Sequence, residues 1–133
     1  MPLSAADITE IEQLVAAHYH HYDRRDPEPF ADTFTEDGVL DLNGRRHEGR
    51  DALAAWAETL NERHGADRFR HWVNNIWIEG EGDEAELRCY LVMFDNTGDG
   101  RVTLIGQYDD RLRREGGKWK FSLRRFVPEW WAR

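Results

Sequence analysis

The sequence predicts an α+β fold, in which three N-terminal helices pack on a strongly curved sheet that is mixed or antiparallel. In the first half of the chain, apolar residues recur at steps of three and four; from Phe69 onward they alternate with a period of two. Helices followed by strands are typical of α+β domains, whereas regular alternation of the two produces a parallel sheet. The length of 133 residues suits one domain over residues 1–133 with one core.

The first helix is predicted to begin at Ser4, a good N-cap residue, and Asp7 three positions later completes a capping box. One helical face then carries Ile8, Ile11, Leu14, Val15, His18, Tyr19 and Tyr22. This face is aliphatic at its start and becomes polar and aromatic at its end. The change indicates that the last two turns face something other than a plain apolar core.

The other elements follow from the same periodicities and from turn residues. Pro27 and Pro29 end the first helix, and Asn43-Gly44 and Glu115-Gly116-Gly117 are turn signals. Helices are predicted over 28–34 and 51–63, strands over 38–42, 69–79, 85–94, 101–114 and 118–127, and a strand or loop over 45–49. Three helices against a bent sheet form a cone, and the polar end of the first helix would face its open mouth.

Composition excludes several partners. A net charge of −8 disfavours binding to nucleic acid or to an anionic membrane, and no run of about 18 apolar residues is present. The N-terminus lacks the apolar stretch of a signal peptide, so we expect a cytoplasmic protein. The single Cys89 lies in an apolar run, which predicts a buried, inert thiol. Six Trp, six Phe and four Tyr can fill a core or line a cavity for a flat, apolar ligand.

Three local patterns resemble the NTF2-like superfamily, in particular its SnoaL-like branch. They are Phe34-Thr35-Glu36-Asp37-Gly38 before the first strand, His47-Glu48-Gly49-Arg50-Asp51-Ala52 before the third helix, and Gly117-Lys118-Trp119-Lys120-Phe121 at the start of the last strand. Their order and spacing extend over nearly the whole chain. The resemblance implies the α+β cone of that superfamily.

Within this branch the segment Tyr22-Asp23-Arg24-Arg25-Asp26 is similar to one in the scytalone dehydratases. The dehydratases and dehydrochlorinases of the branch pair the first aspartate with a histidine that opens the third strand, where His71 stands. The resemblance therefore implies that Asp23 and His71 form a catalytic dyad. It also implies an active-site role for Arg124, which follows Trp119-Lys120-Phe121-Ser122-Leu123. Two features differ: residues 88–95 contain no second histidine, and His18 stands where the dehydrochlorinases have a lysine.

The residues themselves support this chemistry. A neutral imidazole accepts a proton best when a carboxylate fixes its tautomer, and Asp23 can do this for His71. Strand alternation puts Asn75 on the face of His71, as a polar group inside the cone. Tyr22 and His18 are either cavity groups or buried structural ones. The predicted catalytic residues are His71, Asp23, Tyr22 and Arg124, and the predicted substrate-binding residues are His18, Tyr19, Trp56, Asn75 and Tyr90.

Other chemistry is disfavoured. His18, His20 and His21 spread around their helix, because successive residues are about 100° apart, and no metal-binding motif is present. Of Arg124 and Arg125, one should face inward, where it binds substrate or pairs with an acid such as Asp109 or Asp110. We expect neither a metal nor a cofactor.

The sequence thus predicts a cofactor-independent lyase of the dehydratase type, or a related isomerase or cyclase. Its substrate would be a small, apolar, cyclic molecule. The alternative is a non-catalytic subunit of the same fold that binds a small molecule or serves assembly, similar to the small β subunit of ring dioxygenases. Trp130 and Trp131 are too apolar for a free tail, so they cover a pocket or a subunit interface. We expect a homodimer or homotrimer.

Overall fold

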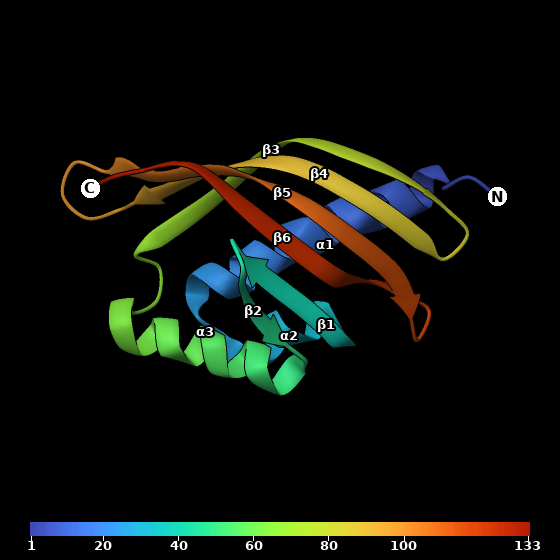
Figure 1. The fold of residues 1–133 in the computed structure, drawn as a ribbon, viewed down its shortest axis with the longest axis horizontal. Helices are drawn as coiled ribbons and strands as arrows, with labels where there is room; N and C mark the ends of the chain where they lie inside the picture. The colour runs from blue at the N-terminus through green and yellow to red at the C-terminus, as the bar shows by residue number, and fades with distance from the viewer.

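The computed structural model describes residues 1–133 as three helices and one six-stranded sheet (Figure 1). The helices are α1 (Ala5–Arg24), α2 (Pro27–Asp32) and α3 (Arg50–His64). The strands are β1 (Phe34–Leu42), β2 (Arg45–Glu48), β3 (Phe69–Glu81), β4 (Glu84–Asp95), β5 (Arg101–Glu115) and β6 (Lys118–Trp131). The predicted α+β class is confirmed. The three helices are not contiguous, however, because β1 and β2 lie between α2 and α3.

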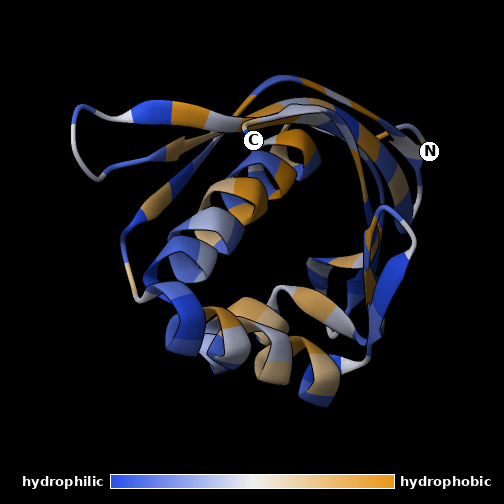
Figure 2. Cartoon of the chain, turned by 60° about the vertical axis from the view of Figure 1, so that its left-hand side comes forward, coloured by the Kyte–Doolittle hydropathy of each residue, from blue (hydrophilic) through white to orange (hydrophobic).

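The sheet is mixed, with the strand order β2-β1-β6-β5-β4-β3. Strands β3 to β6 form an antiparallel meander, whereas β1 pairs with β6 in parallel. Figure 2 shows the sheet passing over α1 on one side, with α3 on the other side of that helix. The first helix is thus enclosed between the sheet and the other helices.

Helix α1 carries the predicted capping box, in which Ser4 and Asp7 each bond the other's backbone N–H. Arg25 ends the helix in a left-handed conformation with φ of 59°, and Pro27 then occupies the start of α2, where no N–H is needed. Figure 2 shows α1 mainly hydrophobic near its start and mainly hydrophilic toward its end. None of the helices combines the length and apolar character that crossing a bilayer requires.

The core lies between α1 and the inner face of the sheet. It contains the fully buried Ile11, Phe30, Phe34, Leu87 and Phe121, whose burial provides most of the drive to fold. Gly106 in β5 allows a close approach here, since a Cβ atom at this position would lie 2.5 Å from the ring of Phe126. A larger residue would push Phe126 away from the interior.

Strands β3, β4 and β5 differ from the predicted ranges by one or two residues, whereas β1 and β6 are each four residues longer at one end. β1 begins at Phe34 rather than at residue 38, and β6 continues to Trp131 rather than ending at residue 127. The extension of β6 arises because Trp130 and Trp131 pair with Ile105 and Leu104 of β5. The two tryptophans therefore belong to the sheet.

An irregularity in β3 corrects one prediction. The register with β4 shifts between Asn74 and Trp77, and Asn75 has a φ of 54°, a conformation that asparagine tolerates better than most residues. The shift exchanges the two faces of the strand. Asn75 and Trp77 are therefore exposed, while Ile76 packs against the core, so the expectation that Asn75 lies inside the cone is wrong.

Candidate active site

Asp23 and His71 meet where the end of α1 crosses the start of β3. An oxygen of the Asp23 carboxylate lies 2.5 Å from Nδ1 of His71. The other oxygen accepts a hydrogen bond from the backbone N–H of His71 at 3.2 Å. Both side chains are nearly buried, with 9 % of Asp23 and 7 % of His71 exposed. The carboxylate therefore fixes both the position and the orientation of the imidazole.

This contact also fixes the tautomer of the neutral imidazole. An ionised carboxylate can only accept hydrogen bonds, so the Nδ1–H group of His71 donates to Asp23. The lone pair is then on Nε2, which is free to take a proton from another molecule. The carboxylate also stabilises the imidazolium that forms when Nε2 is protonated.

Two tyrosines of α1 support the imidazole. The ring of Tyr22 lies 4.9 Å from that of His71 with an interplanar angle of 15°, and the ring of Tyr19 lies 5.2 Å away at 19°. Phe30 packs on Tyr22 at 4.7 Å. These stacked rings limit the rotation of His71.

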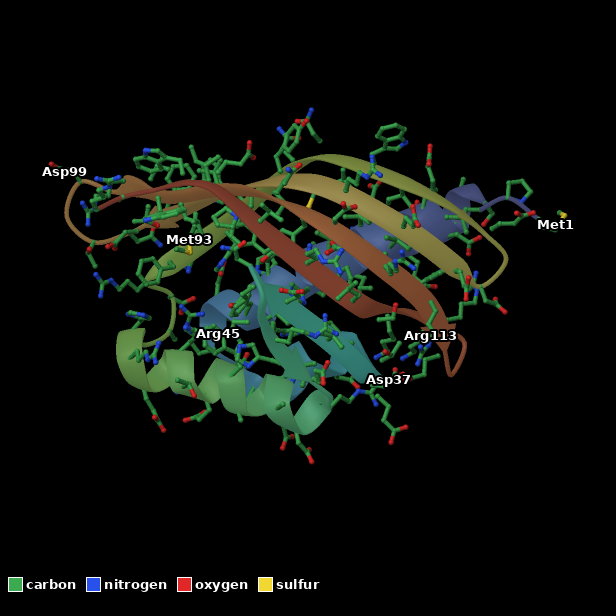
Figure 3. All side chains as sticks on the ribbon, in the orientation of Figure 1. Met1, Asp37, Arg45, Met93, Asp99 and Arg113 are labelled. Atoms are coloured by element: carbon green, nitrogen blue, oxygen red, sulfur yellow. The ribbon has the colours of Figure 1, made fainter.

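His71 and Tyr22 line an apolar cavity of about 390 Å³ between the sheet and α3. Its other walls are formed mainly by Leu42, Trp56, Leu60, Phe69, Leu91, Met93, Leu104, Tyr108, Phe126 and Trp131. Met93, labelled in Figure 3, pairs with His71 across β3 and β4 and lies on the side of the sheet that faces α3. A small, largely apolar molecule fits this volume and composition.

Polar groups in the cavity are few. The indole N–H of Trp56 donates to the hydroxyl of Tyr22 at 3.0 Å, so these two predicted residues are adjacent on the wall. Arg25, Asn43 and His64 also line it. None of these three was predicted from the sequence, because each lies at the end of an element, where no periodicity assigns a direction to the side chain.

Of the two arginines, Arg124 is the one that faces inward, and Arg125 is half exposed near Asp41. Arg124 does not line the cavity, however. It is fully buried, and two of its N–H groups donate to one oxygen of Asp110 at 2.8 and 3.1 Å. Its guanidinium lies 4.0 Å from the ring centre of Tyr108, which separates it from the cavity. The predicted direct action of Arg124 on a substrate is therefore corrected to an internal ion pair.

His18 and Tyr19 also lie behind the cavity wall. His18 is fully buried among aromatic rings, and its Nδ1–H donates to the hydroxyl of Thr33 at 2.8 Å, because that hydroxyl already donates to the carbonyl of Phe30. Burial lowers the pKa of His18 well below its usual value, so the ring is neutral. Of the two alternatives for His18, the structure favours the buried structural group, and Tyr19 contacts His71 rather than the cavity.

Tyr90 was predicted to bind substrate, and this prediction is wrong. Near Tyr90 the buried positions of β4 are Leu87, Cys89 and Leu91, and Tyr90 alternates with them on the outer face, 56 % exposed. Burial raises the pKa of the Cys89 thiol to about 11, so this residue is protonated near neutral pH. The chain contains no group of three or more His, Cys, Asp or Glu residues that could hold a metal ion.

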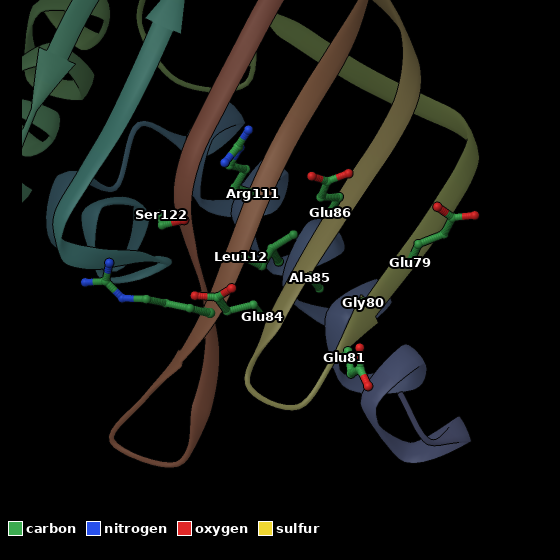
Figure 4. A pocket seen from close by; sticks show the side chains of 10 residues that line it. Glu79, Gly80, Glu81, Glu84, Ala85, Glu86, Arg111, Leu112 and Ser122 are labelled. Carbon is green, nitrogen blue, oxygen red and sulfur yellow. The ribbon is translucent and has the colours of Figure 1, made fainter. Parts of the chain in front are cut away.

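A second cleft lies at the far end of β3 and β4 and is lined by Glu79, Glu81, Glu84, Glu86 and Arg111, among others (Figure 4). It is polar and contains none of the predicted site residues. Along β3, His71 and Glu79 are roughly 25 Å apart at the usual rise per residue. The acidic cleft is therefore separate from the Asp23–His71 pair.

Comparisons with known proteins agree with this architecture. Residues 4–125 match the model of the SnoaL-like domain, and the chain belongs to this family. A protein of unknown function with a cystatin-like fold from Nostoc punctiforme is 28 % identical, with a TM-score of 0.88, over 97 % of this chain and 96 % of that one. No curated protein matches the chain.

Two further solved structures are similar. A candidate scytalone dehydratase from Novosphingobium aromaticivorans is 25 % identical, with a TM-score of 0.83, over 96 % of this chain and 87 % of that one. A protein from Catenulispora acidiphila, solved in complex with S-DNPA, is 28 % identical, with a TM-score of 0.80, over 95 % and 96 % of the two chains.

Proposed function

We propose that the protein is a cofactor-independent enzyme that removes a proton from carbon in a small, apolar, cyclic substrate. The observation that carries this proposal is the His71 imidazole, which Asp23 holds at 2.5 Å and which lines an apolar cavity of about 390 Å³. A base on the wall of an apolar cavity has little function for a protein that only binds its ligand. It is the group that abstraction of a proton from an activated C–H bond requires.

The proposed reaction begins with transfer of a substrate proton to Nε2 of His71, while the C–H electron pair moves into the substrate. Asp23 stabilises the imidazolium, and the Tyr22 hydroxyl donates to the oxygen that gains negative charge. In an elimination, the electrons then expel a hydroxyl, which takes the proton from His71 and leaves as water. Isomerisation returns the proton to another carbon, and cyclisation uses the carbanion to form a bond. We favour elimination, in line with the similarity to the candidate scytalone dehydratase.

The alternative, a non-catalytic binding or assembly subunit, does not require the imidazole and carboxylate to touch. The short contact between Asp23 and His71 and their double anchoring therefore favour the enzyme. A pair with only a structural role would also not need its imidazole on the wall of a cavity.

The test uses a probe, because proton abstraction can be measured without the natural substrate. With 2-tetralone in D₂O, proton NMR should show that the wild-type protein accelerates the exchange of the hydrogens next to the carbonyl. His71→Ala should lose about 10²–10⁴-fold of this acceleration. His20→Ala, which removes an exposed histidine of α1, should retain it. If the wild type fails to accelerate exchange in 2-tetralone and in a series of small cyclic ketones, the proposal is wrong.

We also propose that the outer face of the sheet binds a second copy of the chain. A row of apolar side chains crosses four strands there, formed by Trp72, Val92, Ile105 and Trp130 in direct register. Of these, Trp72 is 64 % and Trp130 is 48 % exposed, which is unusual for a surface that stays in water. Light scattering should give the mass of a dimer or trimer for the wild type and that of a monomer for Trp72→Glu. A monomeric wild type would contradict this.

A further inference from the structure

We propose that Trp56 is a positioning residue that turns the Tyr22 hydroxyl into a hydrogen-bond donor aimed at the ligand, which makes the cavity selective for molecules with a carbonyl oxygen. This inference rests on the proposed function, because it names the substrate class of the same site. The evidence comes from the hydrogen bond between α1 and α3 and from the groups around it.

The direction of that hydrogen bond is unambiguous. An indole N–H can only donate, so Nε1 of Trp56 gives its hydrogen to the oxygen of Tyr22 at 3.0 Å. This bond occupies an acceptor site of the Tyr22 oxygen, so the hydrogen of the hydroxyl must point elsewhere. The protein offers no acceptor for it, since the bond to Trp56 is the only one that the hydroxyl makes.

Both partners are held in place. The Tyr22 ring is packed between Phe30 and His71, with ring centres at 4.7 and 4.9 Å. The Trp56 ring stacks on His47 at 4.5 Å with an interplanar angle of 25°. The hydroxyl therefore keeps its place on the cavity wall, beside the imidazole, with its donor direction preset.

Such a donor discriminates between ligands. A carbonyl oxygen satisfies the O–H group of Tyr22, whereas a hydrocarbon leaves it without a partner in an apolar cavity, which is unfavourable. Donation from Trp56 also polarises the hydroxyl and strengthens its own donation. Burial raises the pKa of Tyr22, so the hydroxyl keeps its hydrogen at neutral pH and above.

The arrangement of donor and base defines the substrate more closely. The Nε2 atom of His71 requires an acidic C–H bond, and the Tyr22 hydroxyl requires an acceptor oxygen. A ketone or ester with a hydrogen on the carbon next to the carbonyl satisfies both groups at once. The negative charge that follows proton removal then develops on the oxygen that Tyr22 binds.

The test compares two ligands of similar shape, 2-tetralone and the hydrocarbon tetralin, by titration calorimetry. The wild type should bind the ketone more tightly, and Tyr22→Phe should reduce this preference by about two- to tenfold. Trp56→Phe keeps an aromatic ring without the N–H group and should reduce the preference for the ketone while tetralin binding stays unchanged. Trp77→Phe, on the exposed outer face, is the matched control.

Infrared spectra of 2-tetralone labelled with ¹³C at the carbonyl give a second measurement. The band should shift to lower frequency in the wild-type complex and return toward its value in an apolar solvent in Tyr22→Phe. In Trp56→Phe it should broaden, because the hydroxyl is no longer held in one direction. A loss of affinity that is equal for both ligands in Trp56→Phe would show a merely structural role and overturn the inference.

The outcome is separable from that of the proposed function. Asp23→Asn should keep the preference for the ketone, because the His71 ring still packs on Tyr22 and the bond to Trp56 is unchanged, although this variant loses proton exchange. A wild type that binds both ligands equally, or binds neither, contradicts the assignment of Trp56 and Tyr22. That result does not affect the exchange assay, which tests the proposed catalytic roles of His71 and Asp23 separately.

Discussion

The interior of the protein holds two pairs of an acidic and a basic side chain, Asp23 with His71 and Asp110 with Arg124, and the pairs differ mainly in what surrounds them. Asp23 and His71 are nearly buried, and His71 lines the cavity. Arg124 and Asp110 are fully buried, and the ring of Tyr108 lies between Arg124 and the cavity. Both pairs contact the ring of Tyr19, with His71 at 5.2 Å and the guanidinium at 5.1 Å.

The comparison shows what makes a buried pair suitable for chemistry. His71 lines the cavity, and Asp23 holds its Nδ1–H so that the lone pair of Nε2 can accept a proton from a ligand. Arg124 stays charged at all ordinary pH values and has no contact with the cavity. The resemblance to known enzymes implies an active-site role for both residues. The structure distinguishes them, because His71 lines the cavity and Arg124 does not.

The largest effect is expected for Asp23→Asn. This change removes the charge that stabilises the imidazolium, and it no longer holds the neutral imidazole in one tautomer. Proton exchange in 2-tetralone should therefore fall by about 10²–10⁴-fold. The free energy of unfolding, measured in urea, should change far less than for a buried ion pair. Asp26→Asn is the matched control, since Asp26 lies at the same turn and its side chain makes no capping bond. Equal exchange rates in the two variants would remove Asp23 from the mechanism.

The next largest effect is expected when the buried ion pair of Arg124 and Asp110 is broken. Arg124→Met leaves Asp110 buried without its partner and should lower the free energy of unfolding by about 3–5 kcal/mol. The double variant Arg124→Met with Asp110→Leu should recover most of this loss, because no uncompensated charge remains. Proton exchange per folded molecule should persist in the double variant. Its complete loss in a folded double variant would show that Arg124 acts on the substrate after all.

Much of the fold could be predicted from sequence because it follows from local rules. The capping box of Ser4 and Asp7 and the change from helical to strand periodicity near Phe69 are properties of short segments, and the structure shows both. The meeting of Asp23 with His71 depends on contacts between distant segments. It was inferred from the resemblance and not from the pattern alone.

The errors have physical causes that periodicity does not contain. The irregularity between Asn74 and Trp77 inserts one extra residue into β3, which exchanges the faces of the strand, so strict alternation assigned Asn75 to the wrong side. Alternation predicted that one of Arg124 and Arg125 faces inward, but it could not tell whether that side chain lines the cavity or lies in the layer behind it. The bond between Trp56 and Tyr22 joins two helices whose relative rotation no single helix determines.

The smallest expected effect is the dependence of folding stability on pH, to which His18 and Asp110 contribute with opposite signs. Burial holds the pKa of His18 well below its usual 6.5 in the folded protein. Below about pH 6.5 the unfolded chain therefore binds a proton that folded His18 cannot bind, and stability falls as pH falls. Burial raises the pKa of Asp110 to about 6, although Arg124 opposes the rise. The folded state therefore binds the extra proton between about pH 4 and 6, and this contribution falls as pH rises.

Comparison with His18→Asn isolates the histidine, because an asparagine amide can still donate to Thr33 while it cannot titrate. Between pH 7 and 5, the free energy of unfolding of the wild type should fall by up to about 1.4 kcal/mol per pH unit more than that of the variant. Urea denaturation at each pH measures this difference, and His47 and His64 contribute equally to both proteins. Parallel curves for the two proteins would mean that His18 gains a proton in the folded state, and its assignment as a neutral structural group behind the cavity would then be wrong.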